Sequence, residues 1–385
     1  MPELSRAVVT TPHSGIRTMA EIARQIPDVI RLEVGDPDFV TPAHIIKAAA
    51  SAALAGYTGY PPSAGYASLR ELIAEKVTRR NHLATTPDEV VVTTGAGGGL
   101  FTTLLALLNP GDEVLVSDPV WPGYPAQIHL QNGVLKRFSL DRSRAFALDP
   151  DALEYAIGPR TRVLIINSPC NPTGAVYGAA ELKRVVEIAE RHDLWVISDE
   201  AYDEIVLEGK SVSLATLGGR DRIISVFSFS KTYAMTGWRI GYVVASAELA
   251  NIIGKMQEPV VASASALSQK GAEAALLGPQ DVVGRMVASY RERLDFAMEL
   301  LDGEGIGYVR PRGAFYLMVD TSPAGDSLEF AQRLLREERV ATVPGSAFGP
   351  GGEGMVRVSL AASRENLEVG LKALSSCLRR EVLRR

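Results

Sequence analysis

One stretch of the sequence decides the fold and points to the chemistry: Ser228-Phe229-Ser230-Lys231-Thr232-Tyr233-Ala234-Met235-Thr236-Gly237-Trp238-Arg239. The largely apolar run 222–227 before it predicts a buried strand. Lys231 therefore lies just past a strand end, where α/β folds keep their ligands. An amine at that position can form a Schiff base, and Ser228 and Arg239 are suited to hold a phosphate. Most lysines in polar turns are simply exposed to solvent, so this interpretation depends on what the rest of the chain supplies.

Length and composition indicate a two-domain globular protein. With 385 residues, the chain exceeds the size at which a single core usually stops growing. Charged residues make up 22% and the formal net charge is −5, so no basic excess predicts a nucleic-acid surface. The most apolar stretch, 100–108, is about half of a membrane span, and the N-terminal residues lack a signal-peptide pattern. We therefore expect a cytoplasmic protein with neither a membrane nor a nucleic-acid partner.

Cysteine and histidine usage argues against two further classes of protein. Cys170 and Cys377 stand far apart in the sequence, so no disulfide framework is expected. The histidines show no spacing typical of metal ligands, and we expect no metal site among His13, His44, His82, His129 and His192.

Short β-rich runs alternate with helical periods through the middle of the chain. Uniformly apolar strands separated by helices are typical of a mainly parallel sheet covered on both faces. Strands are expected at 89–94, 112–116, 161–166, 194–198, 223–227 and 239–244, and the clearest helices at 98–108 and 179–192. This pattern predicts an α/β fold whose large domain spans residues 45–280.

The pattern changes near residues 278–279. Helical spacing and strand-like runs then follow one another at 282–301 (helix), 313–319 (strand), 327–338 (helix) and 355–360 (strand). The N-terminal residues look extended and loop-rich enough to lie beside this part. We therefore predict a smaller α+β domain, with an N-terminal arm, formed by residues 1–44 and 281–385.

A glycine-rich turn follows the first predicted strand: Gly95-Ala96-Gly97-Gly98-Gly99. It opens a helix, whose N-terminal N–H groups can bind a phosphate that approaches the glycine backbone closely. The spacings of dinucleotide-binding turns and P-loops are not met, because Leu100 stands where a third glycine is needed and no Gly-Lys-Ser/Thr follows. A tight turn without a ligand would look similar, so the turn supports a phosphate site only together with other features.

Polar and aromatic residues follow further predicted strands. Asn171 lies in Asn-Pro-Thr-Gly, and another strand is followed directly by Asp199-Glu200-Ala201-Tyr202. Pyridoxal 5′-phosphate (PLP) needs an anion beside its pyridine nitrogen to act as an electron sink, which Asp199 would supply. Asn171 and Tyr202 would supply donors near its phenolic oxygen, and Trp121 a flat face for its ring. Each residue also has an ordinary structural explanation as a helix N-cap, a turn residue or a core aromatic.

Arg357 lies in the strand-like run 355–360. A buried arginine needs an anion, and a carboxylate fits its planar fork best. An internal salt bridge would meet the same need, so the sequence leaves open whether that anion is a ligand.

The order of these features, more than any single motif, indicates a family. The chain resembles the fold-type I PLP-dependent aminotransferases of class I/II, which include aspartate and aromatic aminotransferases. The resemblance runs from about Ser14 to the C-terminal helix, and its most specific segment is 228–241. The N-terminal pattern of that group is also matched, by Val34-Gly35-Asp36-Pro37-Asp38-Phe39 and by the stretch from Tyr60 to Arg70.

The resemblance gives each candidate residue a role. Lys231 matches the Schiff-base lysine, which also moves the proton between the substrate Cα and the cofactor, and Asp199 matches the partner of the pyridine nitrogen. Tyr60 matches a phosphate ligand supplied by the neighbouring subunit, so the resemblance implies a homodimer with composite sites. The other matches are the ring-stacking Trp121; the donors Asn171 and Tyr202; the phosphate contacts Ala96, Gly97, Ser228 and Arg239; and the substrate contacts Gly35, Trp121, Asn171 and Arg357, the last for the α-carboxylate.

The chain departs from the family pattern at two places. The glycines at 97–99 replace a stretch that usually carries a hydroxyl, lysine or glutamine side chain, so we expect phosphate binding by backbone alone there. Cys170 stands before Asn171, where many relatives have histidine or asparagine. We expect Cys170 to be a small packed residue, although a thiol beside the ring would be open to oxidation.

The resemblance implies a ping-pong aminotransferase that moves the amino group of an L-amino acid to a 2-oxo acid through a Lys231 aldimine, with 2-oxoglutarate as one partner. Fold does not fix function, so a C–S β-lyase or another amino-acid-modifying biosynthetic enzyme stays open. A remote alternative reads Ser228-Phe229-Ser230-Lys231 as the S-x-x-K motif of serine acyl transfer, but its S-D-N and K-T-G companions are missing.

The amino donor stays open at this level. Dicarboxylate-specific relatives place a basic side chain against the distal carboxylate, and the helix at 100–108 has none. This favours an apolar or aromatic donor without deciding the matter, because the cation can come from elsewhere, including Arg17 or the other subunit. Dicarboxylic, aromatic and aliphatic donors are therefore all compatible with the sequence.

Overall fold

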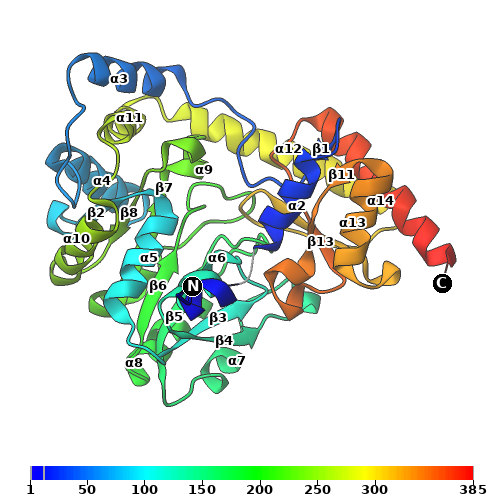
Figure 1. Ribbon diagram of the computed structural model, residues 1–385, viewed down its shortest axis with the longest axis horizontal. Helices are drawn as coiled ribbons and strands as arrows, with labels where there is room; N and C mark the ends of the chain where they lie inside the picture. The colour runs from blue at the N-terminus through cyan, green and yellow to red at the C-terminus, as the bar shows by residue number, and fades with distance from the viewer. Residues whose placement is uncertain (1, 12–13, 385) are drawn as a thin grey trace.

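The computed structural model describes residues 2–11 and 14–384, so His13 lies outside the described residues. Within them, the strands form a seven-stranded sheet, a four-stranded sheet and a two-stranded pair (Figure 1). The two larger sheets lie in different parts of the molecule. The predicted division of the chain at residues 45 and 280 stays a prediction.

The large sheet confirms the predicted mainly parallel α/β architecture. β8 runs antiparallel to both of its neighbours, and the other strands pair in parallel. Uniformly apolar runs suit such a sheet because its central strands are buried on both faces. In spatial order the strands are β2 (Val90–Thr93), β8 (Gly241–Val244), β7 (Ile223–Ser228), β6 (Trp195–Asp199), β5 (Thr161–Asn167), β3 (Glu113–Asp118) and β4 (Val134–Ser139).

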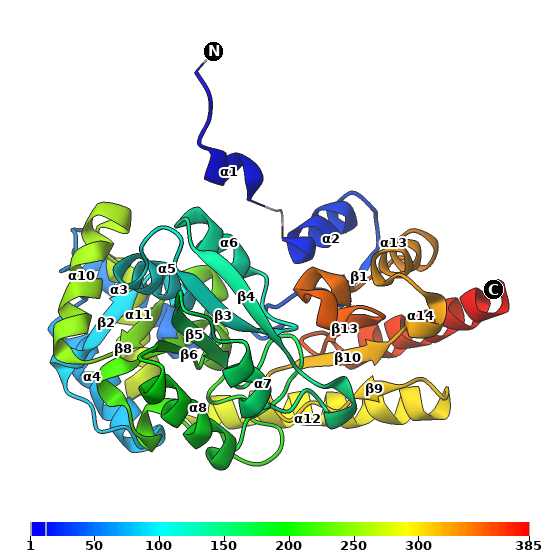
Figure 2. The same cartoon turned by 90° about the horizontal axis from the view of Figure 1, so that it is seen from below.

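Helices cover both faces of this sheet (Figure 2). Successive side chains of a strand point to opposite faces, so Val114 and Val116 of β3 belong to one apolar cluster and Leu115 to another. The first cluster is completed by α5 (Gly95–Leu107), α6 (Gly123–Leu130) and α10 (Ala247–Val261). The second is completed by α3 (Ala43–Leu54), α4 (Ala67–Arg80), α7 (Pro150–Tyr155), α8 (Ala179–Arg191) and α11 (Ala266–Leu277).

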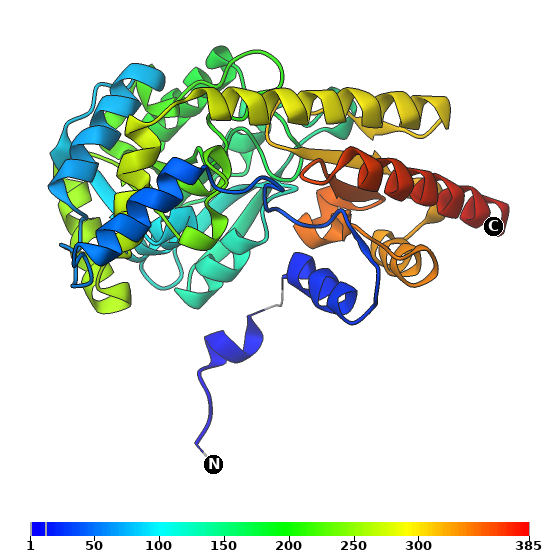
Figure 3. The same cartoon turned by 90° about the horizontal axis from the view of Figure 1, so that it is seen from above.

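A long helix, α12 (Asp281–Gly303), connects the large sheet with the smaller one (Figure 3). Val283 near its start packs in the large-sheet core, whereas Met286 and Tyr290 pack in the core of the smaller part. The four-stranded antiparallel sheet has the order β12 (Val343–Pro344), β13 (Met355–Ser359), β10 (Tyr316–Asp320), β9 (Tyr308–Val309), and α13 (Ser327–Glu338) and α14 (Arg364–Arg384) pack beside it. The helices predicted at 282–301 and 327–338 are thereby confirmed.

The N-terminal residues correct the expectation of an extended, loop-rich segment. Residues 6–10 form α1 and residues 15–24 form α2. Met19 and Ala23, four residues apart, are buried, as expected for an amphipathic helix with one face on the protein. Figure 3 shows α1 standing away from the body of the molecule and α2 lying against its smaller part. After α2, β1 (Ile30–Arg31) pairs in parallel with β11 (Val340–Ala341).

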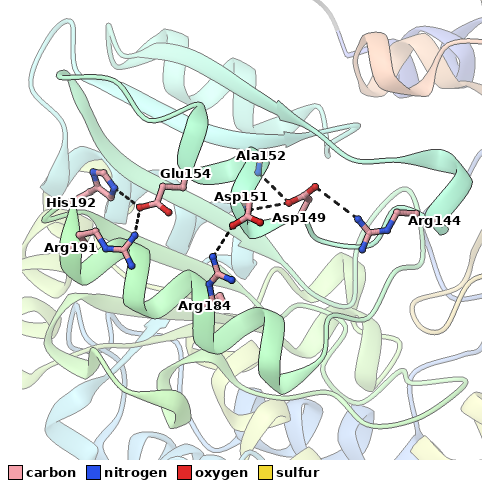
Figure 4. Close-up of polar contacts among 8 residues, drawn as sticks. All are labelled: Arg144, Asp149, Asp151, Ala152, Glu154, Arg184, Arg191 and His192. Carbon is pink, nitrogen blue, oxygen red and sulfur yellow. Dashed lines mark hydrogen bonds and ion pairs between the residues drawn. The ribbon is translucent and has the colours of Figure 1, made fainter.

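Ion pairs on the surface connect α7 with α8 (Figure 4). Arg184 Nη2 lies 2.7 Å from Asp151 Oδ1, and Glu154 pairs with both Arg191 and His192. Asp149 caps α7 by accepting hydrogen bonds from the N–H groups of residues 151 and 152. Because these pairs are exposed, each contributes on the order of 1 kcal/mol or less to stability, and the buried apolar clusters hold the fold.

Candidate active site

The carboxyl ends of three neighbouring parallel strands, β5, β6 and β7, lie side by side. Asn167 at the end of β5 is in register with Asp199 at the end of β6. β7 ends at Ser228 and continues into the one-turn helix α9 (Phe229–Thr232), which carries Lys231. The loops of an α/β sheet gather at this edge, so chain segments far apart in sequence meet here.

A cavity of about 400 Å³ opens at this edge. The structure brings all but one of the predicted site residues around it: Gly35, Ala96, Gly97, Trp121, Asn171, Asp199, Tyr202, Ser228, Lys231, Arg239 and Arg357. The exception is Tyr60, which is 92% exposed and does not line the cavity of its own chain.

The amine of Lys231 is hydrogen-bonded to the backbone of the N-terminal segment. Its Nζ donates a hydrogen bond to the carbonyl oxygen of Gly35 at 2.6 Å. The pKa of Lys231 is lowered to about 8, chiefly by removal of the amine from water; Asp36 raises it, and Arg239 and Arg357 contribute to the lowering. Near neutral pH an appreciable fraction of the amine is therefore uncharged, which is the form that attacks a carbonyl carbon.

Asp199 places a carboxylate inside the protein. Its Oδ2 accepts a hydrogen bond from the hydroxyl of Tyr124 at 2.5 Å, and its Oδ1 accepts one from the N–H of Ala201 at 3.1 Å. Burial raises the pKa of Asp199, and these two hydrogen bonds act against that rise. Among the described residues no lysine or arginine forms an ion pair with Asp199, so a cationic group of a ligand would find an unneutralised partner.

The N-terminus of α5 and Arg239 form one end of the cavity. α5 begins at Gly95 and not at the predicted residue 98, because burial of the helix against the sheet overrides the poor helix propensity of glycine. A Cβ built on Gly95 would lie 2.8 Å from Nη2 of Arg239, whereas one on Gly97 would meet nothing within 4 Å. A guanidinium group thus packs against the helix start beside open space, an arrangement suited to a phosphate.

Arg357 is a fully buried cation with neutral partners. Its Nη1 donates to Oδ1 of Asn171 and its Nη2 to the carbonyl oxygen of Glu33, both at 2.8 Å, and its Nε has no partner among the described residues. The guanidinium lies over the ring of Tyr316, and burial lowers the pKa of Arg357. Among residues 2–11 and 14–384, the internal salt bridge that the sequence left open is therefore not formed. The Glu33 carboxylate raises the pKa of Arg357 but forms no direct ion pair with it. A buried charge without an ion-pair partner is costly, so the arrangement suits an anionic ligand.

Comparison with known proteins assigns the family. The family model described as "Aminotransferase class I and II" matches residues 27–374. The chain belongs to the class I and II aminotransferases. It is therefore a PLP-dependent enzyme that moves an amino group from an amino acid to a 2-oxo acid, as the resemblance of the sequence implied.

Curated relatives and solved structures agree with this assignment. This aminotransferase is 39% identical to the aspartate/prephenate aminotransferase of Thermus thermophilus, over 94% of each chain. It is 38% identical to the aspartate aminotransferase of Thermotoga maritima, over 91% of this chain and 92% of that one. The Thermus aspartate aminotransferase solved with maleate superimposes with a TM-score of 0.94, at 38% identity over 98% of this chain and 100% of that one.

The residues around the cavity fit the family's cofactor. A buried carboxylate without a cationic partner suits a protonated pyridine nitrogen, and the open space beside Gly97 and Arg239 suits a phosphate. An amine with a lowered pKa lies in the same cavity. The alternative S-x-x-K interpretation gains no support, because Oγ of Ser228 caps α9 by accepting a hydrogen bond from the N–H of Ser230.

Sequence reasoning missed two tyrosines of this aminotransferase. Tyr124 is three residues after Trp121 on the edge of α6, and its hydroxyl reaches Asp199. The hydroxyl of Tyr316 lies 2.9 Å from that of Tyr202. Trp121 lies before the start of α6 at Gly123, so the two residues share no helix face and the sequence held no local signal for Tyr124. The position of Tyr316 depends on the packing of the small sheet against the large one.

Charged residues of the N-terminal segment were also missed. The sequence suggested Arg17 as a source of a distal cation, but Arg17 is exposed and pairs with Glu21 at 3.6 Å. Arg24 and Arg31 line the cavity instead. Both positions depend on how α2 and β1 pack against the smaller part of the fold.

Cys170, the residue before Asn171, is completely buried, and burial raises the pKa of its thiol. It is absent from the described residues that line the cavity, so it packs in the core as a small apolar side chain does.

No helix in the described part of the chain combines the length and apolar character needed to cross a membrane. Nor do residues 2–11 and 14–384 bring together a group of histidine, cysteine, aspartate or glutamate side chains that could hold a metal ion.

Proposed function

We propose that the cavity holds PLP and that Lys231, Asp199 and Arg357 carry an amino transfer from an L-amino acid to a 2-oxo acid, with 2-oxoglutarate as one partner. The observation that carries this proposal is the meeting of three groups in one cavity. These are an amine with a lowered pKa, a buried carboxylate without a cationic partner and a buried guanidinium without an anionic one.

Different residues would hold different ends of the cofactor. Asp199 would pair with the ring nitrogen, and Asn171 and Tyr202 would donate to the phenolic oxygen. Trp121 would stack on the ring. The phosphate would be held by the N-terminal backbone of α5 at Ala96 and Gly97 together with Ser228 and Arg239. When bound, PLP supplies the electron sink for bonds broken at the substrate Cα.

Lys231 has two tasks in this proposal. As the uncharged amine it would be the group that bonds covalently to the bound cofactor. With the amine free and a substrate bound, Lys231 would be the base that holds and moves the proton of the substrate Cα. Its lowered pKa serves both tasks, because a fully protonated amine could perform neither.

Arg357 would bind the α-carboxylate of the substrate, with Asn171 and Gly35 beside it. A planar guanidinium that presents two N–H groups to one carboxylate fixes the direction of the substrate. Lys231 donates to the carbonyl oxygen of Gly35, so a carboxylate bound beside Gly35 would lie near the lysine.

We further propose a cytoplasmic homodimer in which Tyr60 contacts the phosphate in the neighbouring site. The exposure of Tyr60 and its absence from the lining of its own chain's cavity support a contribution to a second copy. A hybrid dimer tests this. Subunits carrying Lys231→Ala and subunits carrying Tyr60→Ala should regain activity when mixed, because one of the two hybrid sites has both native residues. Mixtures that stay as inactive as their parents would contradict composite sites.

The main proposal is tested by the amino transfer itself. Purified protein loaded with PLP should convert 2-oxoglutarate to glutamate in the presence of a panel of amino acids that includes aspartate, phenylalanine and leucine. The same mixtures assayed for ammonia and sulfide distinguish transfer from β-lyase activity. Release of ammonia or sulfide without glutamate formation would overturn the proposal.

A further inference from the structure

Glu33 brings an additional carboxylate to the cavity. Its side chain is 1% exposed, and Glu33 is among the residues that line the cavity. Its Oε1 accepts a hydrogen bond from Nε of Arg31 at 2.5 Å. Its Oε2 is buried and has no partner among the described residues. One oxygen of this carboxylate therefore lacks a hydrogen-bond partner among the described residues.

Local structure fixes the backbone position of Glu33. The carbonyl oxygen of Glu33 accepts a hydrogen bond from Arg357. On the preceding residue, the N–H of Leu32 donates to Ala341 and its carbonyl oxygen accepts from the N–H of Ser359. These contacts hold the backbone at Glu33 between β11 and β13.

The positively charged residues that remain available to a substrate side chain lie in the same N-terminal segment as Glu33. In the proposed function Arg239 is used by the phosphate and Arg357 by the α-carboxylate. Two cations, Arg24 and Arg31, then remain on the wall formed by the N-terminal segment, and Arg31 is already engaged by Glu33. Ile16 and Ala20 supply the apolar part of this wall.

Two substrate side chains of the same shape, one ending in a carboxylate and the other in a carboxamide, would interact differently with this wall. A side-chain carboxylate would bring a second negative charge near the unpartnered oxygen of Glu33, and like charges repel strongly where water is excluded. A carboxamide of equal size would offer an N–H donor to that oxygen. Supplying a partner to a buried unsatisfied acceptor removes its desolvation cost.

We propose that Glu33 is a specificity-determining residue that selects against anionic substrate side chains and favours those that end in an N–H or O–H donor, such as a carboxamide. The inference rests on the proposed amino transfer and concerns the choice of substrate within it. Arg31 acts in the opposite direction, because its positive charge favours an anionic substrate side chain.

Isosteric substrate pairs test this inference. We expect Glu33→Gln to raise kcat/KM for glutamate relative to glutamine, and for aspartate relative to asparagine, by roughly tenfold. Arg31→Gln should change the same ratios in the opposite direction. Glu21→Gln, an exposed position on α2 outside the cavity, serves as the control and should leave the ratios unchanged.

Equilibrium binding gives a second readout that does not depend on turnover. Glutarate and its monoamide can be titrated calorimetrically into the PLP-loaded protein, and Glu33→Gln should tighten binding of the diacid relative to the monoamide. Unchanged ratios in both variants, with amino transfer intact, would overturn the role of Glu33. Absence of amino transfer with every donor would instead overturn the proposed function.

Discussion

The hydroxyl of Tyr124 donates a hydrogen bond to Oδ2 of Asp199 at 2.5 Å, linking α6 to the end of β6. Burial and the neighbouring Asp199 raise the pKa of Tyr124 well above its usual value, so the hydroxyl keeps its proton and acts as the donor. Burial raises the pKa of Asp199, and the hydrogen bond from Tyr124 lowers it. Tyr124 therefore helps to keep Asp199 charged, which is the form that a pyridine nitrogen requires.

The variant Tyr124→Phe should shift the activity profile along the pH axis. Removing the donor takes away a contribution that lowers the pKa of Asp199, so this pKa rises further. The acidic limb of kcat/KM against pH should move to higher pH, with a loss of roughly tenfold at neutral pH, typical for a hydrogen bond to a charged group. Tyr155→Phe is the control, because Tyr155 is 93% exposed. A Tyr124→Phe profile that superimposes on that of the native protein would contradict this role.

The variant Lys231→Ala should bind PLP without the visible absorbance that a lysine-linked cofactor gives. Turnover should fall by at least about 10³-fold, since both nucleophile and proton carrier are lost. Added methylamine should restore part of the activity, because a small amine can enter the space left by the side chain. Lys255→Ala, at an exposed position of α10, is the matched control. An unchanged spectrum in Lys231→Ala would remove Lys231 from the site.

Much of the fold could be predicted because many strands and helices show their characteristic residue pattern within their own segment of sequence. The apolar run 161–166 predicts β5 almost to the residue, and the periodicity over 282–301 predicts α12. The same locality identified the site residues that follow strand ends, such as Asp199 and Lys231. In a parallel sheet, the position of a residue just past a strand already places it at the ligand-binding edge.

The parts that could not be predicted depend on contacts between distant segments. Tyr124 and Asp199 are 75 residues apart in sequence. No pattern in the residues around either one predicts their hydrogen bond. Arg31 reaches the cavity because β1 pairs with β11, a two-residue pairing too short to leave a pattern. The start of α5 at Gly95 is decided by packing and not by glycine propensity.

The variant Arg357→Lys should weaken substrate binding. Lysine keeps the positive charge but loses the planar fork that holds a carboxylate through two N–H groups. Loss of a buried charged hydrogen bond typically costs a few kcal/mol, so KM for every amino acid tested should rise by roughly 10²-fold. Arg336→Lys, on the exposed face of α13, should leave KM unchanged. Because all substrates share the α-carboxylate, an effect limited to one donor would argue against this assignment.

Glu200, the neighbour of Asp199, predicts a pH dependence of stability. Its Oε1 accepts hydrogen bonds from the hydroxyls of Ser198 and Ser213, both at 2.9 Å. Burial nevertheless raises the pKa of Glu200 from 4.5 to about 7. The folded protein therefore favours the protonated acid. The stability contributed by this group is complete below pH 4.5 and is lost as the pH rises through 7.

The variant Glu200→Gln stays neutral at every pH and keeps an oxygen acceptor for both serines. We expect it to gain stability relative to the native protein as the pH rises from about 4.5 to 8, by roughly 3 kcal/mol in the free energy of unfolding. Urea denaturation at pH 5 and at pH 8 measures this difference. Glu187→Gln, at an exposed position of α8, should follow the native protein at both values. If the free energy of unfolding changed equally for Glu200→Gln and the native protein between pH 5 and pH 8, Glu200 would have to be charged in the folded state.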